Sequence, residues 1–279
     1  MLFLPLLQET VLFIKEIFVA KYFGTSLSLD LYNLGLVIPM MCMGVVSSGI
    51  VATVTPNYTA FRNKRVFFWY NFKNIFLLNL VIILSIAVIT WLGYQIAFAQ
   101  YDAQQQKTLQ KITFGFLPIV FLQSFSAYFD AILNCENKTI NNSIFGLFIP
   151  LGMFFSLIVF KDFGIVCLII GFYLGYLAKL IFQIILYQSI YKNINSLTTF
   201  DAEGLSVRRD FIALSVSSLI LAVMPVIINF YASKFNTGTI SSFNYAYRLI
   251  AIGFMLCSTV INSVYFPYIS KTFVDNNQS

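Results

Sequence analysis

Two short stretches decide the expected fold: residues 18–26, with the sequence FVAKYFGTS, and residues 230–238, with the sequence FYASKFNTG. Each stretch ends one very apolar segment, turns through a few polar residues and begins another apolar segment. An even number of predicted membrane crossings separates the copies, so both should have the same orientation. This arrangement is typical of a parallel internal repeat, as found in transporters. The residues that recur at one constant offset are Phe18 and Phe230, Ala20 and Ala232, Phe23 and Phe235, and Thr25 and Thr237.

The composition indicates an integral membrane protein. Hydrophobic residues make up 59% of the chain and charged residues 10%, whereas soluble domains carry about 25% charged residues. The apolar runs exceed the ~18 residues that indicate a membrane helix, and they lack the alternation of outer-membrane strands. We therefore expect an all-α, polytopic membrane helix bundle embedded in a lipid bilayer. The net charge of +6 resides in short loops between apolar segments, so we expect no nucleic-acid partner.

The hydropathy pattern predicts about eight transmembrane helices. Short polar turns separate them, and the longest break precedes the second copy of the repeat. The predicted spans are approximately 2–23, 30–54, 67–98, 110–134, 140–160, 163–190, 211–233 and 240–268.

The repeat predicts two lobes. Residues 1–190 are expected to form an N-terminal lobe of about six helices, and residues 191–210 a cytoplasmic linker. Residues 211–279 are expected to form the first helices of an incomplete C-terminal lobe. Because a pair of helices leaves its lobe-facing surfaces uncovered, we expect that the chain is truncated or that a partner chain completes the fold.

The basic residues predict the orientation in the membrane. Tight clusters occur at residues 62–65 and at Arg208 and Arg209. Short cytoplasmic loops are enriched in Lys and Arg. Placing the N-terminus in the cytoplasm puts both clusters on the cytoplasmic side.

The residue inventory excludes several kinds of chemistry. The chain has no histidine, which removes Ser-His-Asp catalysis and His-ligated metal sites. It also lacks a phosphate-binding glycine loop and a pair of catalytic carboxylates. We therefore expect a protein that is not an enzyme and that uses no metal and no cofactor.

Charged residues within the predicted spans are candidates for function, because each costs about 2.5–3.5 kcal/mol to insert. Glu9, Lys15 and Glu16 lie in the first span, and Glu9 and Glu16 share one helical face. They either line a hydrated cavity or form a self-neutralising Lys–Glu pair inside the bundle. Asp130 and Lys179 lie near span ends, where Lys179 is expected to extend towards the interface.

Two further charges lie close to the repeated turns. Asp30 begins the second span, where a carboxylate stabilises the start of its own helix. Arg248 lies more than two turns into the last span, with no acidic residue near it in sequence. Arginine suits bidentate capture of a phosphate, so Arg248 either binds an anion or pairs with a carboxylate of the other lobe.

Prolines and glycines predict local features of the helices. Pro39, Pro118, Pro150 and Pro225 lie inside spans, where proline kinks a helix. The spacing of Gly171 and Gly175 predicts close packing against another helix.

Motifs at both ends of the chain resemble the lipid II flippase family (MurJ/MviN-like) of the multidrug/oligosaccharidyl-lipid/polysaccharide exporter superfamily. They are KEI, AKYFGTS, DLY and IP between residues 15 and 39, and IIN, AS, TGTIS, NYAYRL, FP and ISK between residues 227 and 271. The resemblance implies a two-lobed bacterial inner-membrane protein of about fourteen helices. Such a protein flips an undecaprenyl-pyrophosphate-linked glycan, such as the peptidoglycan precursor lipid II, by alternating access.

The resemblance also assigns residues to a central basic cavity. Lys15 stands where the family usually has an arginine, and Arg248 matches a cavity arginine, so both are expected to bind the headgroup. Glu16 and Asp30 match acidic positions and are expected to support them, together with Glu9.

The sequence departs from the family pattern at three places. Glu9 stands where the family typically has an arginine, residues 41–44 (MCMG) replace a basic pair, and Ser48 replaces an acidic residue. Fewer cations weaken the binding of a pyrophosphate. The alternatives are therefore a flippase for a capsule, O-antigen or exopolysaccharide intermediate, a cation-coupled drug exporter, or an inactive truncated remnant.

Overall fold

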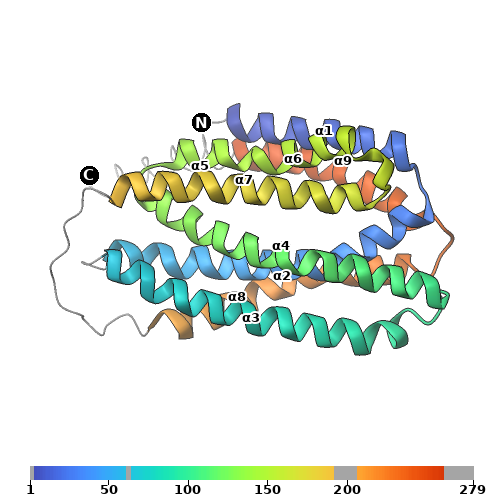
Figure 1. Cartoon of the computed structure of the whole chain (residues 1–279), viewed down its shortest axis with the longest axis horizontal. Helices are drawn as coiled ribbons and strands as arrows, with labels where there is room; N and C mark the ends of the chain where they lie inside the picture. The colour runs from blue at the N-terminus through green and yellow to red at the C-terminus, as the bar shows by residue number, and fades with distance from the viewer. Residues whose placement is uncertain (1–2, 61–63, 192–205, 261–279) are drawn as a thin grey trace, which may run out of the picture.

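The protein is a bundle of long helices. The structure is a computed structural model that describes residues 3–60, 64–191 and 206–260. Within these ranges every regular element is helical, which confirms the all-α class (Figure 1). The helices are α1 (Phe3–Phe23), α2 (Leu27–Ala60), α3 (Lys64–Ala97), α4 (Ala103–Cys135), α5 (Thr139–Gly146), α6 (Phe148–Val159), the short 3-10 helix η1 (Lys161–Phe163), α7 (Val166–Tyr191), α8 (Ser206–Ala232) and α9 (Thr239–Val260).

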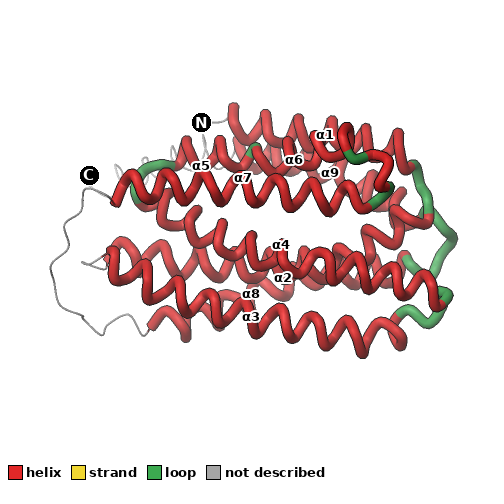
Figure 2. Tube along the Cα trace, in the orientation of Figure 1, coloured by secondary structure: helices red, strands yellow, loops and turns green. Residues whose placement is uncertain are grey.

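The helices coincide with the predicted spans. Five segments of the described residues are long and apolar enough to cross a membrane. The helices run along the long axis of the molecule, and their turns gather at its two ends (Figure 2). The predicted end of the last span, at residue 268, lies outside the described residues. The five spans are Leu27–Thr59, Lys64–Gly93, Ala103–Cys135, Thr139–Val159 and Val166–Tyr191.

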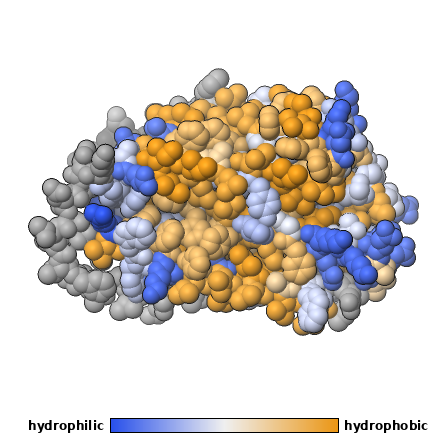
Figure 3. Space-filling view, viewed as in Figure 1, coloured by the Kyte–Doolittle hydropathy of each residue, from blue (hydrophilic) through white to orange (hydrophobic). Residues whose placement is uncertain are grey.

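The surface has the distribution of polarity that a bilayer requires. Apolar side chains cover the middle of the molecule, and hydrophilic residues gather towards its ends (Figure 3). Trp69, Leu84 and Trp91 on α3 are among the exposed large hydrophobic residues. In contrast, α4 is central, since 72% of its apolar stretch is buried against 22% for α3. Exposed apolar surface of this kind is stable against lipid chains rather than water.

The fifth predicted span corresponds to one membrane-length helical segment, Thr139–Val159, with a single interruption. The structure divides residues 140–160 into α5 and α6, which meet at Leu147. Pro150 lies in the first turn of α6. Because proline has no N–H and its ring clashes with the carbonyl four residues earlier, it favours the start of a new helix over the continuation of the old one.

The glycines of α7 permit its close approach to α6, as their spacing predicted. A Cβ atom on Gly175 would lie 2.6 Å from the Cα of Ile149, and one on Gly171 would lie 2.6 Å from the Cα of Met153. On the facing helix, a Cβ on Gly152 would lie 2.6 Å from the backbone nitrogen of Gly175. Both helices therefore need glycine where they touch.

Lys179 does not extend to the interface, contrary to the expectation from its position. It is 7% exposed, and its ammonium lies 2.8 Å from the carboxylate of Asp130. Gln183 donates a hydrogen bond of 2.7 Å to the other oxygen of Asp130. This ion pair joins α4 to α7 inside the bundle, where pairing offsets part of the cost of burying the charges.

The two repeated stretches adopt similar local structures at one end of the bundle, which we call the turn end. Residues 18–26 end α1 and lead into α2, and residues 230–238 end α8 and lead into α9 (Figure 1). Each turn contains a glycine with positive φ, 56° at Gly24 and 91° at Gly238, a conformation that glycine adopts without strain. A helix–turn–helix unit therefore occurs twice at the turn end, although the two glycines do not occupy equivalent positions of the repeat.

Candidate functional site

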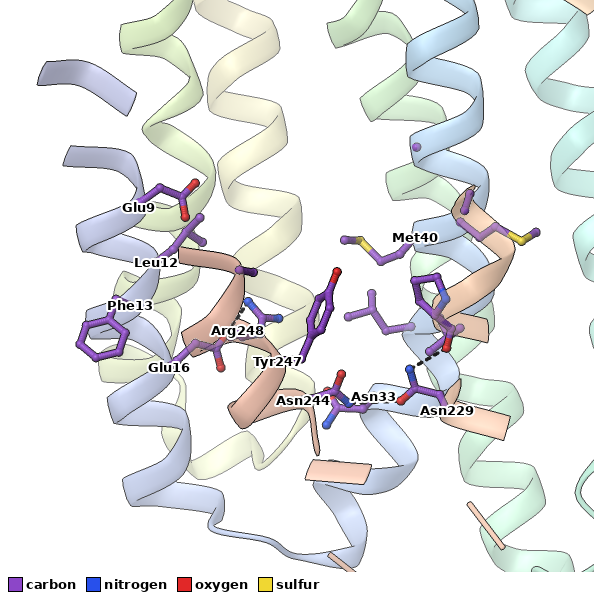
Figure 4. A pocket seen from close by; sticks show the side chains of 17 residues that line it. Glu9, Leu12, Phe13, Glu16, Asn33, Met40, Asn229, Asn244, Tyr247 and Arg248 are labelled. Carbon is purple, nitrogen blue, oxygen red and sulfur yellow. Dashed lines mark hydrogen bonds and ion pairs between the residues drawn. The ribbon is translucent and has the colours of Figure 1, made fainter. Parts of the chain in front are cut away.

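A cavity of about 560 Å³ lies between α1, α2, α8 and α9. One wall, from Leu36 to Gly44 on α2, is apolar. The polar side chains come mainly from α1, α8 and α9, so residues from both ends of the sequence form one site (Figure 4). The charged and amide residues that line the cavity are Glu9, Glu16, Asn33, Asn229, Asn244 and Arg248.

Three charged side chains meet beside this cavity, and we call Lys15, Glu16 and Arg248 the ion triad. The Nη1 atom of Arg248 lies 2.6 Å from the Oε1 atom of Glu16. The ammonium of Lys15 contacts the same carboxylate oxygen. One carboxylate thus holds two cations, which leaves the ion triad with a net positive charge.

Arg248 forms the ion pair that was one of the two sequence alternatives, and its position leaves anion binding a prediction. It pairs with Glu16 of α1, far away in sequence, and it also lines the cavity. Its side chain is 43% exposed, against 14% for Glu16. A guanidinium has five N–H donors, so pairing with one carboxylate leaves it able to bind a further anion.

Lys15 does not line the large cavity, contrary to the expectation from the sequence. It is 3% exposed and lies beside a second, smaller cavity of about 20 Å³. Glu16, Asn33, Asn244 and Arg248 line both cavities. The buried ammonium of Lys15 pairs with Glu16, which was the second alternative from the sequence: a self-neutralising Lys–Glu pair inside the bundle. Lys15 therefore does not contact the large cavity directly. It affects the charge of that cavity through its ion pair with Glu16.

Glu9 and Glu16 share a face of α1, as their spacing predicted. Both project from α1 towards the space occupied by Arg248 and Tyr247 (Figure 4). Glu9 lines the large cavity about two turns closer to the N-terminus than Glu16. The cavity therefore contains two carboxylates and one guanidinium, and it is not strongly basic.

Asp30 lies outside both cavities, in the first turn of α2 as expected, and it has a further role. It is 2% exposed, and its carboxylate accepts hydrogen bonds from the start of α9. The backbone N–H of Gly238 donates at 2.5 Å, and the backbone N–H and hydroxyl of Ser241 donate at 2.8 Å and 2.5 Å. Asp30 therefore caps the positive end of α9 in addition to its expected place at the start of its own helix, α2.

We call Asp30, Gly238 and Ser241 the clasp, because they join the two repeated units at the turn end. Two further hydrogen bonds lie beside it. Tyr245 donates to the carbonyl of Gly24 at 2.9 Å, and Gln100 donates to the hydroxyl of Ser233 at 3.1 Å. A Cβ atom on Gly238 would also lie 2.9 Å from the carbonyl oxygen of Thr25.

Sequence reasoning missed the polar residues that complete these two sites. Asn244 donates a hydrogen bond to Asn229 at 3.2 Å, next to Asn33 at the edge of both cavities. Amides within apolar segments were a usable signal, because buried amides need partners. The partners of Asp30 had a weaker signal: a glycine and a serine at the start of an apolar segment.

Comparison with known proteins now identifies the family. A family model described as lipid II flippase MurJ matches residues 19–279. The chain belongs to this family. The match confirms the resemblance seen in the motifs to a family described as lipid II flippases. Glu9, Lys15 and Glu16 precede the matched residues.

A solved structure of a MurJ protein shares the fold. It is described as lipid II flippase MurJ in an inward closed conformation, with a TM-score of 0.70 and 18% sequence identity. The similarity covers 90% of this chain and 54% of that one, so the chain spans about half the length of the matched protein. No curated protein matches the sequence. Family and apolar helices together show a multi-pass membrane protein.

Proposed function

We propose that the chain takes part in flipping a lipid-linked glycan across the bacterial inner membrane by alternating access. This proposal is based on the cavity between α1, α2, α8 and α9, which is lined by Arg248 and lies next to a closed turn end. The transported lipid is an undecaprenyl-pyrophosphate-linked glycan, either the lipid II precursor of peptidoglycan or a related polysaccharide intermediate. The membership of the chain in the MurJ family supports this substrate class.

Arg248 is the proposed contact for the phosphate groups. An incoming phosphate competes with Glu16 for the guanidinium, which can bind two phosphate oxygens side by side. Lys15 remains with Glu16 and keeps the ion triad positive while the substrate is bound. The amides of Asn33, Asn229 and Asn244 supply donors and acceptors for sugar hydroxyls.

The clasp is the proposed closure on the outer side of the membrane. With the N-terminus in the cytoplasm, α1 crosses once and the turn end faces outward. The N-terminal lobe (1–190) and the C-terminal part (211–279) would then separate at the clasp, with residues 191–210 as their linker. Because the chain covers 54% of the matched structure, we propose that further helices form the rest of the second lobe. These helices would belong to the same chain or to a partner chain.

A flipping assay tests the function. The protein is reconstituted in vesicles with a fluorescent, short-chain polyprenyl-pyrophosphate glycan, and a membrane-impermeant quencher reports the leaflet of the probe. Arg248→Ala should reduce the flipping rate to the protein-free background, and Arg248→Lys should retain part of it, because a lysine keeps the charge but not the planar fork.

The matched control is Lys161→Ala, which removes an exposed cation from η1 that lines neither cavity. It should flip at the original rate. All variants should insert in the membrane and elute as the unaltered protein does. Unchanged flipping in Arg248→Ala would rule out the proposed anion contact.

A further inference from the structure

Glu9 is a cavity carboxylate that forms no close ion pair among the residues that the structure describes, although Arg248 of the same cavity acts on it electrostatically. It lines the large cavity from α1. No salt bridge joins it to a described lysine or arginine, whereas Glu16 contacts both Lys15 and Arg248. An ionised carboxylate at membrane depth is costly unless a cation or water accompanies it. Arg248 supplies part of this compensation without a direct contact, so a further cationic group or water can bind at Glu9.

The charges of the cavity are separated along α1. The ion triad is net positive and lies beside Glu16, and Glu9 lies about two helical turns, or about 10 Å, closer to the N-terminus. Leu12 of α1 and Met40 and Met41 of α2 contribute apolar lining. The cavity thus has a cationic end and an anionic end, which suits a ligand with opposite charges about 10 Å apart.

We propose that Glu9 binds an ammonium group on the glycan headgroup, so that the preferred substrate carries a free amine about 10 Å from its phosphates. This inference depends on the proposed function, because Arg248 must hold the phosphates for the amine to reach Glu9. A sugar with an unacetylated amine, one ring away from the sugar that bears the pyrophosphate, satisfies the spacing. A purely anionic headgroup of the same size would face Glu9 with no compensating charge.

A pair of probes isolates the amine. Both are farnesyl-pyrophosphate disaccharides, and they differ only in the terminal sugar, which is glucosamine in one and N-acetylglucosamine in the other. Their affinities are measured by titration calorimetry with the purified chain in detergent. Because a charge-assisted hydrogen bond contributes about 1.5–3 kcal/mol, the amine probe should bind about tenfold more tightly or better.

Two changes at Glu9 and one control make the comparison specific. In Glu9→Gln the preference for the amine should fall to about one, because the side chain keeps its shape and loses its charge. In Glu9→Arg the preference should reverse. Asp162→Asn makes the same chemical change in the exposed η1 helix and should keep the preference of the original protein.

Different results contradict different claims. Equal affinities of the unaltered protein for the two probes, or a preference that persists in Glu9→Gln, would overturn the amine site alone. Failure of the protein to bind either probe would overturn both the amine site and the proposed function. A preference present in potassium chloride and absent in sodium chloride of equal strength would assign Glu9 to a metal cation and also overturn the proposal.

Discussion

The clasp and the ion triad both join α9 to the N-terminal helices, but they do so by different means. In the clasp, a carboxylate that is 2% exposed binds backbone and hydroxyl donors, and no opposite side-chain charge takes part. In the ion triad, charged side chains meet beside a cavity, and Arg248 remains 43% exposed. A buried hydrogen-bonded cap is suited to closing an interface, whereas an exposed arginine with a replaceable partner is suited to exchanging ligands.

This difference predicts that the clasp contributes more to stability than the ion triad does. Asp30→Ala leaves the N–H groups of Gly238 and Ser241 buried without an acceptor, and hydrogen bonds to a charged group are worth about 1.5–3 kcal/mol each. We expect a loss of about 4 kcal/mol in the free energy of unfolding, measured by denaturant titration in detergent, together with loss of flipping.

Two controls accompany this change. Asp162→Ala removes an exposed carboxylate from η1 and should leave stability within about 0.5 kcal/mol. Asp30→Asn keeps one acceptor oxygen. Its loss in the free energy of unfolding should lie between that of Asp30→Ala and that of Asp162→Ala. If Asp30→Ala unfolds at the same denaturant concentration as the original protein, the capping role of Asp30 is wrong.

A smaller effect is expected within the ion triad, and it should be reversible by a second change. Glu16→Gln leaves Lys15 buried without its carboxylate, which should cost about 2 kcal/mol once the partial exposure of the triad is considered. Adding Lys15→Met removes the unpaired charge and should restore most of the stability, measured in the same titration. A double variant no more stable than Glu16→Gln would show that Lys15 does not depend on Glu16.

Much of the fold could be predicted from the sequence. The length of an apolar segment and the spacing of residues along a helix depend on that segment alone and not on its neighbours. The predicted spans coincide with the helices, and the seven-residue spacing places Glu9 and Glu16 on one face of α1. The interruption at Leu147 lies three residues before Pro150, which the sequence marked as a site where a helix kinks. A proline inside a span either bends the helix or begins a new one, and the neighbouring packing decides between them.

The partners of the charged residues could not be predicted from the sequence. Arg248 has no acidic neighbour in its own segment, and its contact with Glu16 exists only because α9 packs beside α1. The capping of α9 by Asp30 could not be predicted for the same reason: it exists because the two turns lie against each other at one end of the bundle. Local spacing defines the face of a helix on which a charge lies, but helix packing determines what that face contacts.

The central claim is that substrate crosses only when the turn end opens. A reversible cross-link between Thr25→Cys and Gly238→Cys tests it most directly, in a protein whose own cysteines are replaced by alanine. A Cβ atom at position 238 would lie 3.1 Å from the Cβ of Thr25, so the two turns need to move apart by only a few tenths of an ångström to reach the ~3.5–4.5 Å found in disulfides. Each single-cysteine variant serves as a control for the substitution itself.

If the turn end must open, the oxidised double-cysteine protein should stop flipping the fluorescent glycan, and reduction should restore flipping. Oxidation should leave both single-cysteine variants unaffected. If the fully cross-linked protein flips the probe at the rate of its reduced form, then substrate does not need the turn end to open.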